Sequence, residues 1–227
     1  MHKVSIHIDG GYFLKRLPNV RPDFTRSVDD TVKGLIWTIS GHLKNLNRVY
    51  NLENERALLY RVFYYDANPY DGQTHRPISK KFIDYNKSDE ANFRRALFDR
   101  LRKEPNFALR LGIVRRESKW TFTQSASDDL RKGKLKQQDI QDEHLVYGLK
   151  QKGVDMRLGL DIASVVLKKQ ANIIVLLTGD SDFVPASKLA RREGAQIILD
   201  PMWRSVSDDL FEHIDGLHNG LGRSKKS

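Results

Sequence analysis

The sequence has 227 residues, and its 39 lysines and arginines outnumber its 29 aspartates and glutamates, which gives a formal net charge of +10. A hydrophobic content of 39% is enough for a buried core, so the composition excludes a generally disordered chain. The sequence contains no cysteine, which excludes disulfide scaffolds, cysteine-held zinc, iron–sulfur clusters and thiol nucleophiles. The excess of positive charge favours a polyanionic partner.

Two further properties of the sequence bear on location and on metals. The chain opens without a secretory h-region, and no apolar run approaches the roughly 18 residues that a membrane-spanning helix requires. We therefore expect a cytoplasmic protein with no membrane contact. The seven histidines do not fall at the close helical spacings typical of zinc sites, so hard cations held by carboxylates are the first metal candidates.

The N-terminal half predicts alternating strands and helices. Residues 4–8 are rich in β-formers and are cut off by Asp9 and two glycines, which predicts a strand that ends in a loop. Apolar positions recur every three or four residues over 28–49, which is typical of an amphipathic helix. A second strand is expected over 57–65 and a basic helix over 93–103.

The middle of the chain is more polar. Two strand pieces are expected over 108–114 and 120–123, followed by a loop over 125–136, which is rich in serine, aspartate and lysine. Asp155 is then placed as the N-cap of a helix. Its buried face is marked by Leu158, Ile162, Val165 and Val166.

The C-terminal third carries the clearest pattern. Residues 172–178 form a continuous apolar run, which is typical of a parallel strand covered on both faces. A helix over 183–193, closed by Gly194, and a strand over 195–199 complete a βαβ unit with a right-handed crossover. A last helix is expected over 206–214.

This order of elements predicts an α/β fold. We expect a single domain over residues 1–218 that carries a basic insertion at about 94–150. Residues 219–227 are expected to form a flexible basic tail.

Acidic side chains follow the clearest strands. Asp9 ends the first strand, and Asp180 and Asp182 directly follow the apolar run over 172–178. Parallel pairing would bring these positions to one edge of the sheet, where open α/β folds bind ligands. Asp161 borders the buried face of its helix. Because crowded carboxylates repel one another unless a divalent cation lies among them, the sequence favours a metal site at these four residues.

Each carboxylate also has a purely structural interpretation. Asp9 with its two glycines could only shape a turn, Asp182 could only cap the following helix, and Asp161 could be one half of a salt bridge. Asp155 is better explained as an N-cap than as a ligand. Asp66, at the end of another strand, could join the cluster or make an Asx-type turn.

Three motifs together resemble a known family. They are IHIDGGY from Ile6 to Tyr12, KGVD from Lys152 to Asp155 with Asp161 six residues on, and TGDSDFVP from Thr178 to Pro185. The sequence resembles the NYN domain family, LabA-like branch, of the PIN-like nuclease superfamily. The resemblance runs from residue 3 to about 215, and the TGDSDFVP segment is its most specific part.

The resemblance implies a three-layer α/β/α fold with a central, mostly parallel sheet, as in PIN-like nucleases. It also implies hydrolysis of RNA phosphodiester bonds by acidic residues that bind Mg²⁺ or Mn²⁺. At matching positions these metal-binding and catalytic residues are Asp9, Asp161, Asp180 and Asp182. Many members carry Asn three residues after the first Asp, whereas this sequence has Tyr12.

Positive charge is concentrated between residues 94 and 136, where 13 lysines and arginines face five acidic residues, a net charge of +8. This stretch is the predicted RNA-binding surface, and the alternative is a solvated helix face. Trp120 and Phe122 could stack on unpaired bases or pack in the core. The candidate RNA-binding residues are Arg94, Arg95, Arg115, Arg116, Lys119, Arg131 and Lys132.

The sequence therefore predicts a metal-dependent endoribonuclease, with RNA as the partner. The alternative is an RNA-binding or regulatory NYN module with weak or no nuclease activity, which Tyr12 keeps open. A phosphatase of the haloacid dehalogenase type is rejected, because that family needs an acid where this sequence has Gly11.

Overall fold

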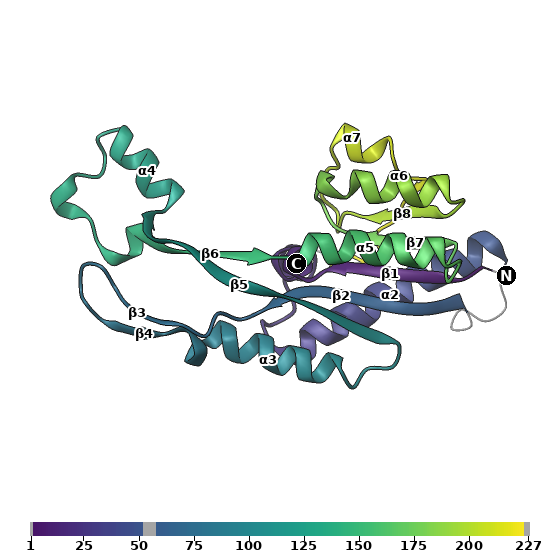
Figure 1. Ribbon diagram of the computed structural model, residues 1–227, viewed down its shortest axis with the longest axis horizontal. Helices are drawn as coiled ribbons and strands as arrows, with labels where there is room; N and C mark the ends of the chain where they lie inside the picture. Colours follow the sequence, from purple (N-terminus) through teal and green to yellow (C-terminus); the bar gives the residue numbers. More distant parts are fainter. Residues whose placement is uncertain (1, 52–57, 225–227) are drawn as a thin grey trace. The chain divides into compact units, whose positions relative to one another are not determined.

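The computed structural model describes residues 2–51 and 58–224 (Figure 1). Its internal contacts divide the chain into two units. Three segments make up the first unit and two make up the second. The first unit is Met1–Asp66, Ala96–Leu111 and Gly153–Ser227, and the second is Ala67–Arg95 and Gly112–Lys152.

The central sheet is mostly parallel, with seven strands in the order β6–β5–β2–β1–β7–β8–β9. In the first unit β1 pairs in parallel with β2 and β7, β7 with β8, and β8 with β9. The strands expected over 4–8, 172–178 and 195–199 are confirmed, as is the one over 57–65, whose residue 57 lies outside the described residues. The five strands are β1 (Val4–Asp9), β2 (Leu59–Asn68), β7 (Ile173–Leu177), β8 (Gln196–Asp200) and β9 (Gly216–Leu217).

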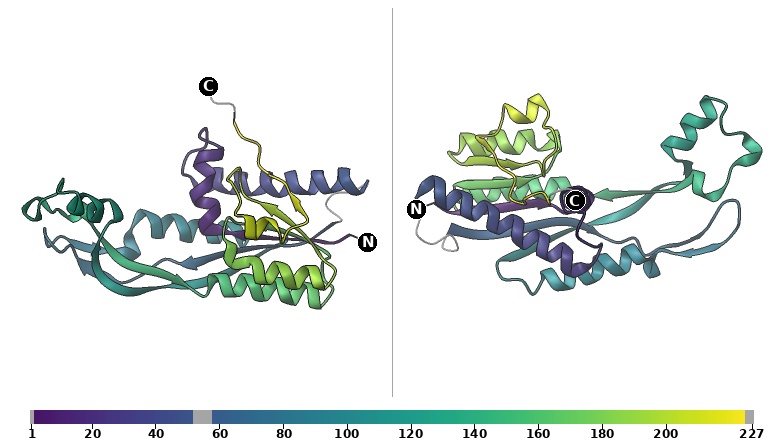
Figure 2. Two further views of the ribbon diagram at one scale, coloured as in Figure 1. Left: turned by 90° about the horizontal axis from the view of Figure 1, so that it is seen from above. Right: turned by 180° about the vertical axis from the view of Figure 1, so that it is seen from behind.

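Helices cover both faces of this parallel sheet (Figure 2). On one face, His42 of α2 lies 2.7 Å from Asp200 of β8. On the other face, Asp161 of α5 accepts a hydrogen bond from Tyr65 of β2. The chain therefore has the three-layer α/β/α fold that the sequence predicts. The covering helices are α1 (Gly10–Val20) and α2 (Val28–Tyr50) on the first face, and α5 (Val154–Leu167) and α6 (Val184–Arg192) on the second.

The junction of β1 and α1 differs from the sequence prediction. A loop was expected after Asp9, but helix α1 begins at Gly10. Asp9 accepts a hydrogen bond from the backbone N–H of Tyr12 at 3.0 Å and so caps this helix. A Cβ at residue 10 would lie 2.6 Å from the ring of Tyr64, so only glycine allows the helix to start this close to the sheet.

Other helix ends shift as well. The expected Asp155 N-cap is wrong: the N-cap of α5 is Gly153, with φ of 75°, and Asp155 lies in the first turn. The helix expected over 206–214 shrinks to α7 (Asp208–Phe211). The helix expected over 183–193 is α6, preceded by the 3₁₀ turn η5 (Ser181–Phe183). Among the described residues, no helix is both long enough and apolar enough to cross a bilayer.

The second unit is built mainly from antiparallel ribbons. Two strand pieces were expected, but β5 is one strand from Phe107 to Phe122 with an irregular register between Arg116 and Trp120. The expected loop over 125–136 is partly wrong, because Thr123 caps a short helix there. Helix α3 begins at Asp89, four residues before the helix expected over 93–103. Both α3 and β5 cross the boundary of the unit, since residues 96–111 belong to the first unit. The remaining elements are β3 (Gln73–His75), β4 (Phe82–Asp84), α3 (Asp89–Leu101), α4 (Gln124–Arg131), β6 (Leu145–Lys152) and the 3₁₀ turns at Tyr85–Lys87, Gln137–Asp139 and Asp142–His144.

The boundaries of this unit differ from those of the predicted insertion at about 94–150. The unit includes residues 67–93, which precede that range, and leaves out 96–111, which lie within it. The assignment of residues 1–218 to a single domain stays a prediction.

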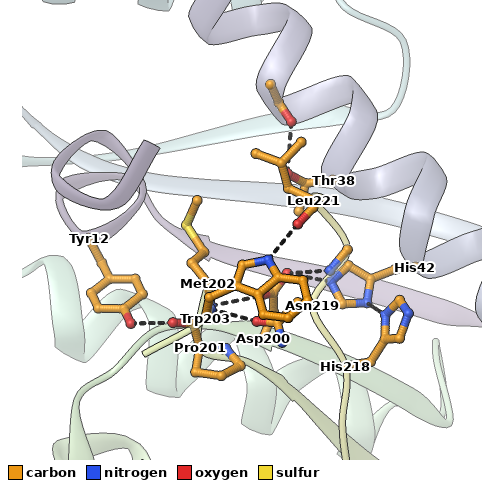
Figure 3. A network of polar contacts seen from close by, with 12 residues as sticks. Tyr12, Thr38, His42, Asp200, Pro201, Met202, Trp203, His218, Asn219 and Leu221 are labelled. Carbon is orange, nitrogen blue, oxygen red and sulfur yellow. Dashed lines mark hydrogen bonds and ion pairs between the residues drawn. The ribbon is translucent and has the colours of Figure 1, made fainter. Parts of the chain in front are cut away.

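The segment after β9 packs against α2 and β8 (Figure 3). Asp200 accepts hydrogen bonds from the backbone N–H groups of Met202 and Gly220 and lies against His42, which in turn contacts His218. Leu221 is only 3% exposed, and its carbonyl accepts a hydrogen bond from the indole of Trp203. Residues 219–224 of the expected flexible tail are therefore held by specific contacts, and residues 225–227 lie outside the described residues.

Candidate active site

Two of the predicted carboxylates end neighbouring parallel strands. Asp9 is the last residue of β1, and Asp180 follows β7 by three residues; the register pairs Ile8 with Leu177. Asp180 accepts a hydrogen bond from the backbone N–H of Asp182 at 3.0 Å and caps the η5 turn. Asp9 therefore has a structural role, as a helix cap. The cap role considered for Asp182 is wrong, because the N-cap of α6 is Phe183 and it is Asp180 that caps the preceding turn. Each of these two caps engages the Oδ1 oxygen of its carboxylate.

The electrostatics show that these carboxylates crowd one another. The pKa of Asp9 is raised to about 6, first by burial and then by the nearby charges of Asp155, Asp66 and Asp180, against the lowering effect of the Tyr12 N–H. The pKa of Asp155 is raised by burial and by Asp180 and Asp182. We call Asp9, Asp66, Asp155, Asp180 and Asp182 the acidic cluster. Asp155, for which a structural role was favoured, and Asp66, which was left undecided, therefore belong to it.

The acidic cluster fits a divalent cation by its chemistry. Carboxylate oxygens are the ligands of hard cations, and a dication would remove the repulsion that raises these pKa values. Within residues 2–51 and 58–224, however, no three acidic or histidine side chains are already arranged to hold a metal. Asp155, Asp180 and Asp182 are exposed, so their side chains are accessible from solvent.

A pocket of about 410 Å³ opens on one side of the acidic cluster. It is lined by Asp9 and Asp180 together with two cations, Lys15 of α1 and Arg204, which follows β8. Tyr12 also lines this pocket, and its hydroxyl donates a hydrogen bond to the carbonyl of Pro201 at 2.7 Å. The site therefore combines carboxylates with positive groups that can bind a phosphate.

Gly179 keeps this pocket compact. A Cβ at this position would lie 2.6 Å from the Tyr12 ring, so a larger residue would push the Tyr12 side chain or the Asp180 loop out of place. The TGDSDFVP motif thus needs glycine between its strand and its first carboxylate for steric reasons.

The structure brings Asp161 into a different network. Its carboxylate forms an ion pair with Arg110 at 2.7 Å and accepts a hydrogen bond from the Tyr65 hydroxyl at 3.1 Å. The Tyr65 oxygen lies 2.9 Å from Nδ1 of His7, whose Nε2 lies 3.0 Å from Ser5 Oγ. Because the single hydroxyl proton of Tyr65 goes to Asp161, His7 Nδ1 must be the donor to Tyr65. The geometry at Asp161 is that of the salt bridge considered from the sequence, and its role as a metal ligand stays a prediction.

The predicted RNA-binding residues of the second unit fall into two groups. Some have partners nearby: Arg94 pairs with Glu90 at 2.6 Å, and Arg131 pairs with Asp128. The others are exposed, except Arg95, which is half-buried and donates to Asn86 and Asn92. The exposed residues are Arg115, Lys119, Lys132 and Arg116, of which Arg116 donates to the Tyr147 hydroxyl.

The NYN domain family model matches residues 62–218 of this sequence. This chain belongs to the NYN domain family. The family is part of the PIN-like nuclease superfamily, so the resemblance drawn from the three motifs is confirmed at that level. A crystal structure of a protein of unknown function from Vibrio parahaemolyticus is similar to this chain, with 13% sequence identity and a TM-score of 0.44 over 95% of this chain and 91% of that chain. No curated protein matches the sequence.

The family match covers part of the predicted site, and the roles of these residues stay a prediction. In this NYN domain it spans Asp161, Asp180 and Asp182, whereas Asp9 lies before its first residue. Lys15 and Arg204 were missed by sequence reasoning. Lys15 could have been found only by recognising helix α1, and Arg204 belongs to an irregular segment whose position depends on contacts distant in sequence.

Proposed function

We propose that this NYN domain is a metal-dependent endoribonuclease. The observation that carries the proposal is the acidic cluster, in which Asp9 is held at a pKa of about 6 beside other carboxylates. Membership of a nuclease superfamily and an overall charge of +10 support the same function, because a polyanionic substrate is attracted to a basic protein.

Each group would have a distinct role. Mg²⁺ or Mn²⁺, when bound, would supply the positive charge that a phosphodiester needs for attack by water. Asp9, Asp180 and Asp182 would hold the cation, with Asp155 in reach. Lys15 and Arg204, on the same pocket, would bind the non-bridging oxygens of the phosphate and orient it against the carboxylates.

Asp161 would act through other residues in this proposal. Its ion pair with Arg110 and its bond to Tyr65 fix the middle of helix α5 on the sheet. The first turn of the same helix carries Asp155. Asp161 is therefore proposed as a positioning residue, in contrast to the direct role that the family resemblance implies for it.

The test is cleavage of end-labelled single-stranded RNA in Mn²⁺, in Mg²⁺ and in EDTA. Asp180→Asn removes one charge of the acidic cluster and keeps the side-chain shape, while Asp29→Asn, on the exposed surface of α2, is the matched control. The proposal expects cleavage by the wild type and by Asp29→Asn in either metal, and none in EDTA or by Asp180→Asn. Cleavage that persists in EDTA and in a folded Asp180→Asn variant would refute it.

One observation favours a second candidate, an RNA-binding module without cleavage. Tyr12 occupies the position where many family members carry Asn, and its hydroxyl is engaged with the Pro201 carbonyl. The pocket therefore lacks a polar group that could orient water at that place. RNA binding that weakens steeply with salt, without cleavage in either metal, would establish this candidate.

A further inference from the structure

The second unit contains a pocket that the proposed active site does not use. Its volume is about 390 Å³, which lies within the range of roughly 300–1,000 Å³ typical of small-molecule sites. All the residues that line it belong to the second unit. Most of the lining is apolar or aromatic and comes from Tyr70, Tyr85, Ala91, Val114 and Leu149.

The two tyrosines that line this pocket, Tyr70 and Tyr85, belong to a cluster of contacting aromatic rings. Tyr85 stacks on Tyr147, with ring centroids 5.6 Å apart and planes 13° from parallel, and Tyr70 meets Tyr85 edge to face at 5.6 Å. Trp120 lies 5.2 Å from the Tyr147 ring and donates its indole N–H to the His75 carbonyl at 3.1 Å. A preformed aromatic wall lowers the entropic cost of stacking a flat ligand.

Positively charged side chains stand beside this apolar pocket. Arg94 lines it and forms an ion pair with Glu90, so a guanidinium and a carboxylate stand among the lining residues. On β5, Arg116 is exposed, lies opposite the pocket residue Leu149 and donates to Tyr147. Arg115 and Lys150 lie on the other face of the ribbon. The second unit as a whole has 15 lysines and arginines against ten acidic residues. A neutral apolar ligand would gain nothing from these charges, whereas a base attached to a phosphate chain would.

We propose that this pocket binds one unpaired base of a single-stranded RNA. The proposal rests on the proposed function, in that RNA is taken as the substrate. Aromatic rings contribute about 1–3 kcal/mol per stacked base, and this stacking tolerates any base because every base has a π-face. A base inside a duplex is already stacked on both sides and cannot enter such a pocket, so the site selects unpaired segments.

Neighbouring residues of β5 provide a matched pair of variants. Val114 lines the pocket opposite Gln151, whereas Ile113 is 42% exposed and lies opposite Lys152 on the other face of the ribbon. Val114→Phe fills the pocket, and Ile113→Phe adds the same volume on the other face. Tyr70→Ala weakens the site in another way, by removing one of the aromatic rings that line the pocket. It keeps the test valid if Val114→Phe does not fold.

The experiment measures binding of fluorescent 12-residue oligouridine and of an abasic ribose-phosphate strand of the same length, both in EDTA. Val114→Phe and Tyr70→Ala should weaken oligouridine binding by roughly 5- to 150-fold. This is the loss of affinity that corresponds to the stacking free energy of one base. Their affinity for the abasic strand, and both affinities of Ile113→Phe, should equal those of the wild type.

Unchanged oligouridine binding by the folded variants, equal losses on the two strands, or no RNA binding by the wild type would overturn the base pocket. Because EDTA removes any metal-dependent cleavage, these results do not depend on the nuclease proposal. That proposal fails separately if the wild type does not cut RNA in Mn²⁺ or Mg²⁺.

Discussion

In the first unit, parallel strands buried on both faces end in carboxylates, whereas in the second unit an antiparallel ribbon combines exposed cations with a cluster of aromatic rings. All five residues of β7 are buried, and the acids that follow β1 and β7 are drawn together by the register of the sheet. The ribbon of β5 and β6 leaves Arg115 and Lys150 in solvent.

This difference separates two kinds of electrostatics. In the first unit burial raises the pKa values of Asp9 and Asp155, and the like charges that the backbone brings together raise them further. In the second unit charged side chains meet opposite charges close by, as Arg131 meets Asp128. We therefore expect substitutions in the first unit to change catalysis and stability, and substitutions in the second to change RNA binding.

The largest expected effect is the loss of cleavage on removing a charge from the acidic cluster. Asp9→Asn should lower kcat/KM for RNA cleavage by about 100-fold or more, because cation binding contributes several kcal/mol to such reactions. Asp161→Asn should lower kcat/KM less and should destabilise the fold, because Arg110 loses its ion-pair partner. Cleavage rates and urea unfolding of both variants check this. An equal loss of activity in a stable Asp161→Asn variant would make Asp161 a direct participant.

The second effect should be confined to binding. Simultaneous charge reversal at Arg115 and Arg116 to glutamate should weaken single-stranded RNA binding by on the order of 50-fold at 50 mM salt. It should also lower the slope of log affinity against log salt by about 2. Cation binding by the acidic cluster should be unaffected.

The control for this charge reversal lies in the first unit. Lys33 and Lys44 are exposed on α2, and their joint reversal to glutamate changes the net charge by the same amount. If this control weakens RNA binding as much as the Arg115 and Arg116 variant does, net charge alone drives binding and the contrast between the units is lost.

A third prediction concerns the buried histidine of the first unit. Burial, with Arg110 nearby, lowers the pKa of His7 from 6.5 to about 3. Between these pH values the unfolded chain binds a proton that the folded chain excludes. Above pH 6.5 His7 is neutral in both states, so its titration does not lower the free energy of unfolding. Below pH 6.5 the free energy of unfolding falls by about 1.4 kcal/mol per pH unit, because protonation favours the unfolded chain.

His7→Gln provides the measurement. The free energy of unfolding of the wild type, relative to this variant, should fall by about 2 kcal/mol between pH 6.5 and pH 5.0 in urea titrations. A difference that stays constant over this range would show that His7 is accessible to protons in the folded protein.

The smallest expected effect is on phosphate positioning. Lys15→Ala and Arg204→Ala should each lower kcat/KM by roughly tenfold. This is the loss of rate that corresponds to the free energy of one charged hydrogen bond to phosphate. Lys188→Ala, an exposed lysine of α6 outside the pocket around Asp9, is the control. Activity unaffected by both pocket variants would remove these two cations from the site.

The sequence predicts the first unit better than the second for a physical reason. The apolar run over 172–178 admits only a buried strand, and the TGDSDFVP motif places its acids by local geometry. Asp155 was assigned wrongly as an N-cap, because local sequence favours that role and gives no sign of its place in the acidic cluster. That place depends on Asp180 and Asp182, which lie 25 and more residues away in sequence.

The second unit shows where local patterns give too little information. Strand β5 is polar and irregular near residues 117–119, so its two halves looked separate, and its pairing with β6 is what joins them. The position of Tyr147 against Tyr85 depends on that pairing and on contacts 62 residues apart in sequence. Nothing near Tyr70 or Tyr85 in the sequence indicates a pocket.

The central claim is that the acidic cluster of the first unit binds a divalent cation, and calorimetric titration of the purified protein with Mn²⁺ tests it most directly. The wild type and Asp29→Asn should bind with equal affinity, and Asp180→Asn should bind at least tenfold more weakly. Equal Mn²⁺ affinity for all three proteins, or no binding by the wild type, would contradict the claim.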